Sequence, residues 1–365
     1  MRKPVLTILG LIFSVSVIWS GWYMIHQTNS VEDKIETTIR EKDPDPTKSA
    51  AIKHEPGHLR DRGHHFRKKT KQDSTVKKNT LDLKEEISKK ERENLWDIKI
   101  PETLPGSILP DHRIVAYYGN LYSKKMGVLG EYPPGTMLEK LKQTAKAWQT
   151  ADPTKKVIPA LQLITVSGQG SPGKDGKYRL RMPFSMVDSV LNMADRIHAL
   201  VILDFQVGKS TVEMEIPRYE KYLQMPHVEL AVDPEFSMKT DNAPGTRIGT
   251  LSAADINFCV NYLKDLVDKY HLPPKVLIVH RFTQDMVTGY RDIHLCSQVQ
   301  IVMDMDGWGH QALKKNTYFR YIYSQPVEYT GFKLFYKNDT KKGGKLMTPE
   351  EVLQLYPQPV YIQYQ

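Results

Sequence analysis

Cysteine is scarce in this 365-residue chain, which holds only Cys259 and Cys296. Two cysteines exclude a disulfide-rich framework and a four-cysteine zinc site. Both lie in apolar surroundings, where buried free thiols are common, although a bridge between them stays open from the sequence. The chain also lacks a Gly-x-Ser-x-Gly nucleophile elbow, and its Gly-rich segment 167–173 lacks the lysine and hydroxyl spacing of a phosphate-binding loop.

An excess of positive charge is absent from most of the chain. The formal net charge of +9 divides into +5 for residues 1–95, from 19 Lys/Arg and 14 Asp/Glu, and +4 for the 270 residues that follow. Nucleic-acid-binding domains usually concentrate strong positive charge on one surface. We therefore expect no nucleic-acid partner.

A long uncharged run predicts a membrane anchor. Val5–Ile25 holds 21 residues without Asp, Glu, Lys or Arg, enough for a helix to cross ~30 Å of hydrocarbon. Arg2 and Lys3 precede it, which places the rest of the chain outside the cytoplasm. A cleaved signal peptide is the alternative, but no Ala-x-Ala site follows the run. We expect residues 1–27 to be a single-pass anchor in the cell membrane.

Residues 28–95 predict a charged, flexible stalk. The segment includes Asp43–Pro46, an alternation of Asp and Pro, and holds few large apolar residues, so it cannot bury a core of its own. The basic cluster of residues 60–78 can contact an anionic cell-envelope polymer, but a solvated tether is an equally good interpretation.

Residues 96–365 alternate between short apolar runs and amphipathic stretches, a pattern typical of β/α units. The strand-like runs are Arg113–Tyr118, Val157–Val166, Leu200–Phe205, Val228–Val232, Lys275–Val279, Val299–Met303, Tyr329–Phe335 and Val360–Tyr364. Near-continuous apolar strands joined by crossovers favour a parallel sheet covered by helices. Eight units predict an α/β fold closed into a (β/α)8 TIM barrel, with an open doubly wound sheet as the alternative.

Carboxylates gather where the predicted strands end, which is where barrel enzymes place their chemistry. Three strands each end in two polar residues spaced two apart, which strand alternation puts on one face. These are Asp204 with Gln206, Asp233 with Glu235, and Asp304 with Asp306. One Asp at such a junction is typically a helix cap, but three pairs at one end predict a functional site.

Close carboxylates push each other's pKa apart, which separates a proton donor from an ionised partner, as glycoside hydrolysis requires. We predict Glu235 as general acid/base, Asp233 as the neighbour that raises its pKa, and Asp204 or Asp304 as the second carboxylate. The seventh strand carries Lys333 where many barrel glycosidases keep a nucleophile, and this puts a retaining mechanism in doubt. The predicted substrate-binding residues are Tyr117, Gln162, Gln206, His280, Asp306, Trp308, Lys333 and Gln363.

Two other functions stay open. Asp204, Asp233, Glu235, His280 and Asp304 are also suitable ligands for a divalent metal, although the predicted barrel contains no His-x-His or His-Glu-x-x-His motif. That alternative is a metal-dependent barrel hydrolase or isomerase. The other is a non-catalytic glycan-binding or envelope protein that keeps the barrel as a scaffold. We expect a glycan or cell-envelope polymer as partner and no organic cofactor.

Three stretches carry a resemblance to a known family: Ala231–Phe236, residues 244–249 with Pro244-Gly245 and Ile248-Gly249, and Val279–Thr283. They resemble a poorly characterised family of bacterial secreted or membrane-anchored TIM-barrel proteins that is similar to glycoside hydrolases. The resemblance covers roughly Asp111–Gln365. It implies a barrel and a site at the strand ends, and it implies no established activity.

Overall fold

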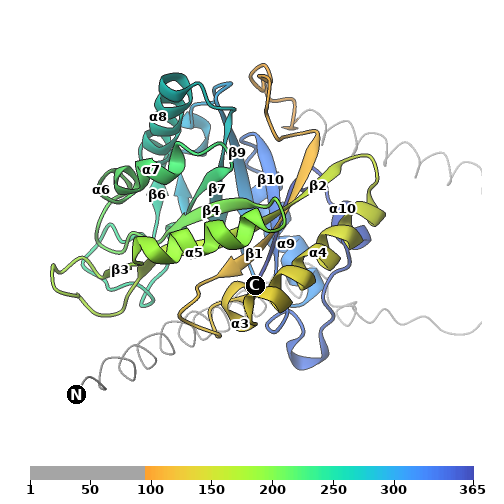
Figure 1. Ribbon diagram of the computed structural model, residues 1–365, viewed down its shortest axis with the longest axis horizontal. Helices are drawn as coiled ribbons and strands as arrows, with labels where there is room; N and C mark the ends of the chain where they lie inside the picture. The colour runs from red at the N-terminus through yellow and green to blue at the C-terminus, as the bar shows by residue number, and fades with distance from the viewer. Residues whose placement is uncertain (1–94) are drawn as a thin grey trace, which may run out of the picture. The chain divides into compact units, whose positions relative to one another are not determined.

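The computed structural model describes residues 95–365, in which eight parallel strands form a closed barrel (Figure 1). The strands, in barrel order, are β1 (His112–Gly119), β2 (Lys156–Gly168), β4 (Leu200–Phe205), β5 (Val228–Val232), β7 (Lys275–Arg281), β9 (Val299–Met305), β10 (Tyr329–Leu334) and β11 (Tyr361–Tyr364). β1 pairs in parallel with both β2 and β11, and this closes the sheet. The predicted TIM barrel is therefore confirmed, and the open doubly wound sheet is wrong.

Helices lie outside the strands (Figure 1). They are α3 (Val128–Glu131), α4 (Pro134–Ala151), α5 (Phe184–Asp195), α6 (Val212–Glu215), α7 (Glu220–Leu223), α8 (Ala253–Tyr270), α9 (Gln311–Tyr318) and α10 (Pro349–Leu353). α8 and α10 each begin with a full capping box, in which Ser252 and Thr348 accept a backbone N–H three residues on. α9 continues at Phe319 into a π-helical turn, η4 (Phe319–Tyr323).

Short elements decorate the barrel. β3 (Arg179–Arg181) pairs antiparallel with β2, and β6 (Leu251–Ser252) pairs with β8 (Val287–Thr288). Single 3-10 turns occur at η1 (Ile216–Tyr219), η2 (Pro234–Phe236), η3 (Tyr290–Asp292) and η5 (Lys341–Gly343). Of these, η2 directly follows β5 and bears on the site described below.

The half of the barrel interior nearer the N-terminal ends of the strands is apolar. Its buried cluster includes Ile114, Ala116, Ala160, Ile278 and Val302, and Leu109 packs against the same group. Gln300 fixes Leu109 there: its Oε1 accepts the Leu109 N–H at 3.0 Å and its Nε2 donates to the Leu109 carbonyl at 2.6 Å. The segment before β1 thus covers the N-terminal end of the barrel.

Two buried glutamates satisfy backbone donors at this N-terminal end. Glu229 accepts the Val276 N–H at 2.6 Å, and Glu328 accepts the Ile301 N–H at 2.6 Å. Burial raises the pKa of both carboxyls, and that of Glu328 rises to about 8. The protonated form is therefore favoured inside the folded protein.

The seam between β1 and β11 is held at the base by Arg113, which is fully buried. Its guanidinium donates to the Pro359 carbonyl at 3.2 Å, to Gln358 Oε1 at 2.8 Å and to Asp152 Oδ2 at 2.9 Å. One side chain on the first strand thereby fastens the segment that leads into the last strand.

Several predictions concern residues outside this range. The anchor (1–27) and the stalk up to residue 94 lie outside the described residues. Within residues 95–365, the helices are too short or too polar to cross a membrane. Cys259 and Cys296 are free thiols, which answers the question that the sequence left open.

Candidate active site

The polar residues at the C-terminal end of the barrel continue the inward-facing positions of the apolar core. Ile202, Ile278 and Val302 face the interior, and the residues two positions further along the same strands are Asp204, His280 and Asp304. Strand alternation therefore carries these three side chains into the upper interior. All three are fully buried. The side chains at these strand ends contact one another through His280.

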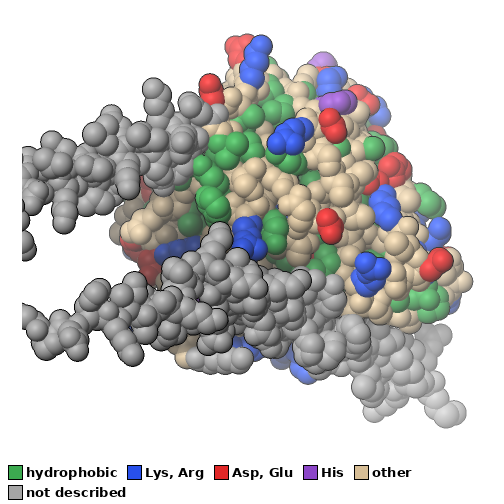
Figure 2. Space-filling view, turned by 180° about the vertical axis from the view of Figure 1, so that it is seen from behind, with side chains coloured by type: hydrophobic (Ala, Val, Ile, Leu, Met, Phe, Trp, Pro, Cys, Tyr) green, Lys and Arg blue, Asp and Glu red, His purple; other side chains and the backbone are tan. Residues whose placement is uncertain are grey.

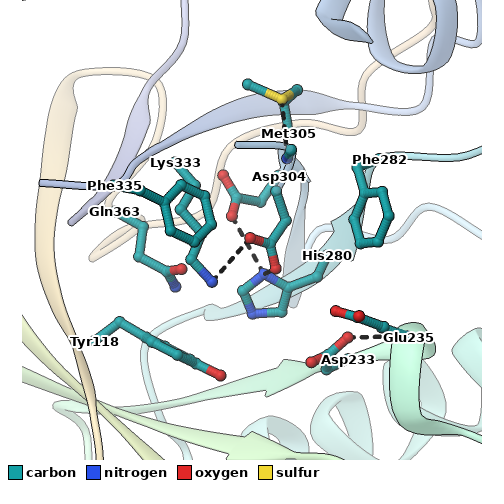
Figure 3. Close-up of polar contacts among 12 residues, drawn as sticks. Tyr118, Asp233, Glu235, His280, Phe282, Asp304, Met305, Lys333, Phe335 and Gln363 are labelled. Carbon is teal, nitrogen blue, oxygen red and sulfur yellow. Dashed lines mark hydrogen bonds and ion pairs between the residues drawn. The ribbon is translucent and has the colours of Figure 1, made fainter. Parts of the chain in front are cut away.

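His280 lies at the centre of these carboxylates (Figure 3). Its Nε2 is 2.9 Å from Asp204 Oδ2, and its Nδ1 is 3.1 Å from Asp306 and 3.3 Å from Asp304. The Nδ1 contacts have ion-pair distances but not the alignment of a hydrogen bond. Burial disfavours the charged ring, but Asp204 and the two other carboxylates outweigh it and hold the pKa of His280 well above its usual range. We therefore treat His280 as an imidazolium at neutral pH.

A chain of hydrogen bonds supports this centre from the side of β2 and β11. Gln162 Nε2 donates to Asp204 Oδ2 at 2.5 Å, so Gln162 and His280 both point donors at one carboxylate oxygen. The Tyr361 hydroxyl donates to Gln162 Oε1 and accepts from Gln363 Nε2 at 2.8 Å. Gln162 and Gln363, two of the three predicted amides, therefore belong to this hydrogen-bonded chain. Tyr361 was not predicted, although it shares an inward face with Gln363.

Lys333 supplies the second positive charge. Its Nζ lies 2.8 Å from Asp306 Oδ1 and 4.0 Å from the centre of the Tyr118 ring. Burial raises the pKa of Asp306, but Lys333 and His280 outweigh it and hold that pKa below its usual value. For Asp304, burial dominates and raises the pKa. The predicted residue on the seventh barrel strand is thus an ion-pair partner in the site.

Gly331 makes room for this arrangement. A Cβ at Gly331 would lie 2.6 Å from Asp304 Oδ1 and 2.8 Å from Tyr361 Cδ1. Gly331 pairs with Asp304 in the β9–β10 register, so the carboxylate occupies the space that a side chain would fill. An isolated Gly inside a strand is the sequence signal for such a close approach.

Asp233 and Glu235 stand together after β5 (Figure 3). Asp233 is buried; its Oδ1 caps η2 by accepting the Glu235 N–H at 2.9 Å, and its Oδ2 accepts from Gln206 Nε2 at 3.0 Å. The Glu235 side chain is partly exposed, and its carboxyl has no hydrogen bond or ion pair with any residue from 95 to 365 for which contacts are described. Asp233 therefore caps η2 and also forms a hydrogen bond with Gln206.

The two carboxyls have different proton affinities. Burial raises the pKa of Asp233 to about 6, with His280 opposing the rise and Asp204 adding to it. Burial also raises the pKa of Glu235 well above its usual range, and the charge of Asp233 raises it further. At neutral pH, Asp233 is mostly ionised, and its charge favours the protonated form of Glu235. The predicted roles of Glu235 as proton donor and Asp233 as its ionised neighbour stay predictions.

Two predicted aromatic residues are placed differently. Tyr117 points away from the barrel interior. On the outer side of the barrel its hydroxyl forms hydrogen bonds with Thr144 of α4 at 2.7 Å and with Tyr336 at 3.1 Å. The next residue, Tyr118, takes the interior position, with its ring edge-on to His280 at 6.1 Å. Trp308 is partly exposed in the loop after β9, with Lys341 Nζ 5.5 Å from the ring centre. The structure thus brings Tyr118 into the site in place of Tyr117.

Several buried polar atoms of the site have no hydrogen-bond partner among the described residues. They are Asp204 Oδ1, both Asp304 carboxyl oxygens, His280 Nδ1 and Gln363 Oε1. Such atoms are uncommon in folded proteins and typically contact water or a ligand. The cluster marks this end of the barrel as a polar interior.

Metal-ligand geometry is not found in the described part of the chain, where no three His, Cys, Asp or Glu side chains are arranged around a common point. One His-Glu-x-x-His string does occur in the sequence, at His54–His58, outside the described residues.

Charge is mixed on the visible surface. In the view of Figure 2, Lys and Arg side chains are interspersed with Asp and Glu on the part of this face that grey atoms leave uncovered. The uncovered part of this face therefore shows no patch of one charge sign.

Comparisons with known proteins concern the fold. No protein-family model matches the sequence, and no curated protein sequence matches it. The chain is similar in structure to a ruminal GH26 endo-β-1,4-mannanase, with 9% identity over 74% of this chain and 64% of that chain and a TM-score of 0.33. It is also similar to the Bacillus subtilis mannanase BCman, with 10% identity over 74% of this chain and 82% of that chain and a TM-score of 0.34. The chain spans slightly less than two thirds of the ruminal enzyme, and its own residues must therefore carry any statement about activity.

Proposed function

We propose that the barrel is a glycan hydrolase in which Glu235 is the general acid/base. The observation that carries this proposal is the state of Glu235, a partly exposed carboxyl with no described partner and with a pKa raised by burial and by Asp233. A group that holds its proton at neutral pH and is not committed to an ion pair can protonate the leaving oxygen of a glycosidic bond. Asp233 keeps it protonated.

The remaining polar residues fit the binding of hydroxyl groups. Lys333 and Gln363 lie on adjacent strands in register, and the Tyr118 ring lies 4.0 Å from Lys333 Nζ and 6.1 Å from the His280 ring. Amide, ammonium and hydroxyl groups hydrogen-bond sugar hydroxyls, and an aromatic face stacks on a sugar ring. Trp308, partly exposed in the loop after β9, offers a second such face.

Glu235→Gln tests the proposal because it keeps the shape of the side chain and removes the titrating proton. Hydrolysis of soluble and cell-wall glycans, measured as released reducing ends, is expected to fall by about 10²–10⁴-fold, the usual contribution of one acid/base group. Glu102→Gln, an exposed change before β1, is the matched control and should retain full activity. Equal activity of Glu235→Gln and the wild type would refute the assignment, and loss with a chelator would favour the metal-dependent alternative.

A non-catalytic glycan-binding protein is the second candidate, and one observation favours it. Asp204, Asp304 and Asp306 are all engaged with His280 or Lys333, so these carboxylates are occupied as structural ion pairs. In that case the wild type binds a glycan without releasing reducing ends, and Glu235→Gln changes affinity by only a few tenths of a kcal/mol, as expected for a rim position.

We also propose that the protein is anchored in the cell membrane by residues 1–27, with its barrel on the extracytoplasmic side. The uncharged run Val5–Ile25 after Arg2 and Lys3 supports this. Protease added to intact cells after wall removal should release a soluble barrel fragment. Full protection of the barrel, or a mature N-terminus just after Ile25 in the medium, would refute it.

A further inference from the structure

The carboxylates at the barrel end fall into two groups. Asp204, Asp304 and Asp306 each lie within 3.3 Å of a nitrogen of His280 or Lys333. Asp233 and Glu235 form no ion pair with any described residue, and their carboxyl groups point toward the side of His280 and Tyr118 (Figure 3). In the first group at least one oxygen of each carboxyl lies in an ion pair, whereas in the second group neither carboxyl does.

None of the paired carboxylates is well placed as a nucleophile. Asp204 and Asp304 lie within 3.3 Å of the ring nitrogens of His280, and a positive charge at that distance makes a carboxylate a weaker nucleophile for the anomeric carbon. Asp306 is held by both Lys333 and His280, which lowers the nucleophilicity of its oxygens. The seventh barrel strand, β10, presents Lys333 at the position that faces the site.

We infer that the site acts on glycans that contain 2-acetamido sugars, and that the acetamido oxygen of the substrate, oriented by Asp233, replaces a protein nucleophile. The inference rests on the proposed hydrolase function and names its substrate class. Substrate-assisted hydrolysis of this kind needs one general acid/base and one carboxylate beside it, with no second catalytic carboxylate across the sugar. The Asp233–Glu235 pair supplies that set.

Asp233 is held in a fixed orientation for this role. Glu235 N–H donates to its Oδ1 and Gln206 Nε2 to its Oδ2, so the carboxylate cannot rotate freely, while each oxygen keeps a further lone pair. An amide N–H of the substrate is a suitable donor to it. That hydrogen bond increases the electron density on the acetamido oxygen and aligns it with the anomeric carbon.

The bonds then balance as follows. The acetamido oxygen forms a bond to C1 while the C1–O bond to the leaving sugar breaks, and Glu235 gives its proton to the departing oxygen. The product is a cyclic oxazolinium ion whose N–H is hydrogen-bonded to Asp233. Water attacks C1 and gives a proton to Glu235, and the ring C1–O bond breaks to restore the acetamide. The sum is hydrolysis with retention, and it requires the leaving group to be trans to the acetamido group, as in β-linked 2-acetamidoglucosides and 2-acetamidogalactosides.

Matched chromogenic substrates test the inference on the full-length protein. The 4-nitrophenyl β-glycosides of chitobiose with N-acetyl groups and of cellobiose differ at C2 of each sugar, and the corresponding 2-acetamidogalactoside covers the other epimer. We expect turnover of an acetamido substrate to exceed that of the 2-hydroxy substrate by at least about 10²-fold, and Asp233→Asn to remove about 10²-fold of it. Asp111→Asn, an exposed change at the other end of the barrel, is the control and should change neither rate.

A thiazoline analogue of the oxazolinium ion provides a readout besides turnover. It should raise the Tm of the wild type and raise it less in Asp233→Asn, even if that variant is less stable. Equal, Glu235-dependent hydrolysis of the 2-hydroxy substrate would overturn the inference and leave the proposed function intact. Formation of an α-glycosyl azide, inverted relative to the β-linked substrate, by Asp233→Ala with added azide would also overturn it, since Asp233 would then be the nucleophile. No turnover of any glycan and no thiazoline binding would overturn both.

Discussion

Glu328 makes the stability of the barrel depend on pH. Its side chain is 6% exposed at the N-terminal end of the barrel, where it accepts the Ile301 N–H at 2.6 Å. Burial raises its pKa from 4.5 to about 8 against the opposing effect of that N–H. In the unfolded chain the carboxyl ionises near its ordinary pKa, so between these two values the folded protein binds the proton more tightly.

The sign of the effect follows from this difference. The raised pKa stabilises the folded state fully below about pH 4.5, and that contribution is lost progressively as pH rises toward 8 and then stays lost. A shift from 4.5 to about 8 corresponds to about 5 kcal/mol in total, of which about 3 kcal/mol falls between pH 6 and pH 9. Relaxation of the site around the charged form makes these values upper limits.

Glu328→Gln removes the titration and keeps an oxygen that accepts the Ile301 N–H. Free energies of unfolding from denaturant titrations at fixed pH values between 6 and 9 should fall with pH in the wild type and fall less steeply in the variant. Glu229, buried nearby with a raised pKa, adds the same slope to both proteins and cancels in the comparison. Parallel pH profiles for the two proteins would refute the reasoning, and Glu102→Gln serves as the exposed control.

Two further changes test the packing that holds the site. Gly331→Ala forces a Cβ to within 2.6 Å of Asp304 Oδ1 and should lower the free energy of unfolding by about 1–3 kcal/mol, measured by chemical denaturation. Gly170→Ala, with nothing within 4 Å, is its control, and equal stability of the two variants would contradict the close approach. Lys314→Met removes a buried ammonium that pairs with Asp339 at 3.0 Å and donates to the Gly307 and Lys333 carbonyls, and should cost about 3–5 kcal/mol. Adding Asp339→Asn to Lys314→Met should recover part of that loss in thermal melts. If the second change instead lowers the stability by as much again, the ion pair is not the cause.

The sequence was sufficient to predict the barrel and the strands that build the site. All eight predicted strands are present, because each apolar run is bounded by helix signals such as the Ser252 and Thr348 caps. Strand alternation also placed Asp204 and Asp304 correctly. These predictions depend on local periodicity, which a single strand displays without its neighbours.

Contacts between strands could not be predicted in the same way. The sequence does not show that His280 stands beside Asp304 in the β7–β9 register, or that Lys333 reaches Asp306. β1 is apolar on both faces, so its pattern gave no means of choosing between Tyr117 and Tyr118. The burial of Lys314 could not be predicted either, since a lysine on a short amphipathic helix normally faces solvent.

The Arg113 seam has a consequence for the order in which the protein forms during synthesis. The Arg113 guanidinium and its Pro359 acceptor are 246 residues apart, and β11 is the last of the eight strands to leave the ribosome. Until it emerges, β1 has an open edge, and Tyr361 and Gln363 are missing from the polar interior. Contacts this distant in sequence form slowly and leave a partly folded chain exposed to mispairing. Before β11 is synthesised, the nascent barrel is therefore an open sheet, and Arg113 lies on the edge strand with which β11 later pairs.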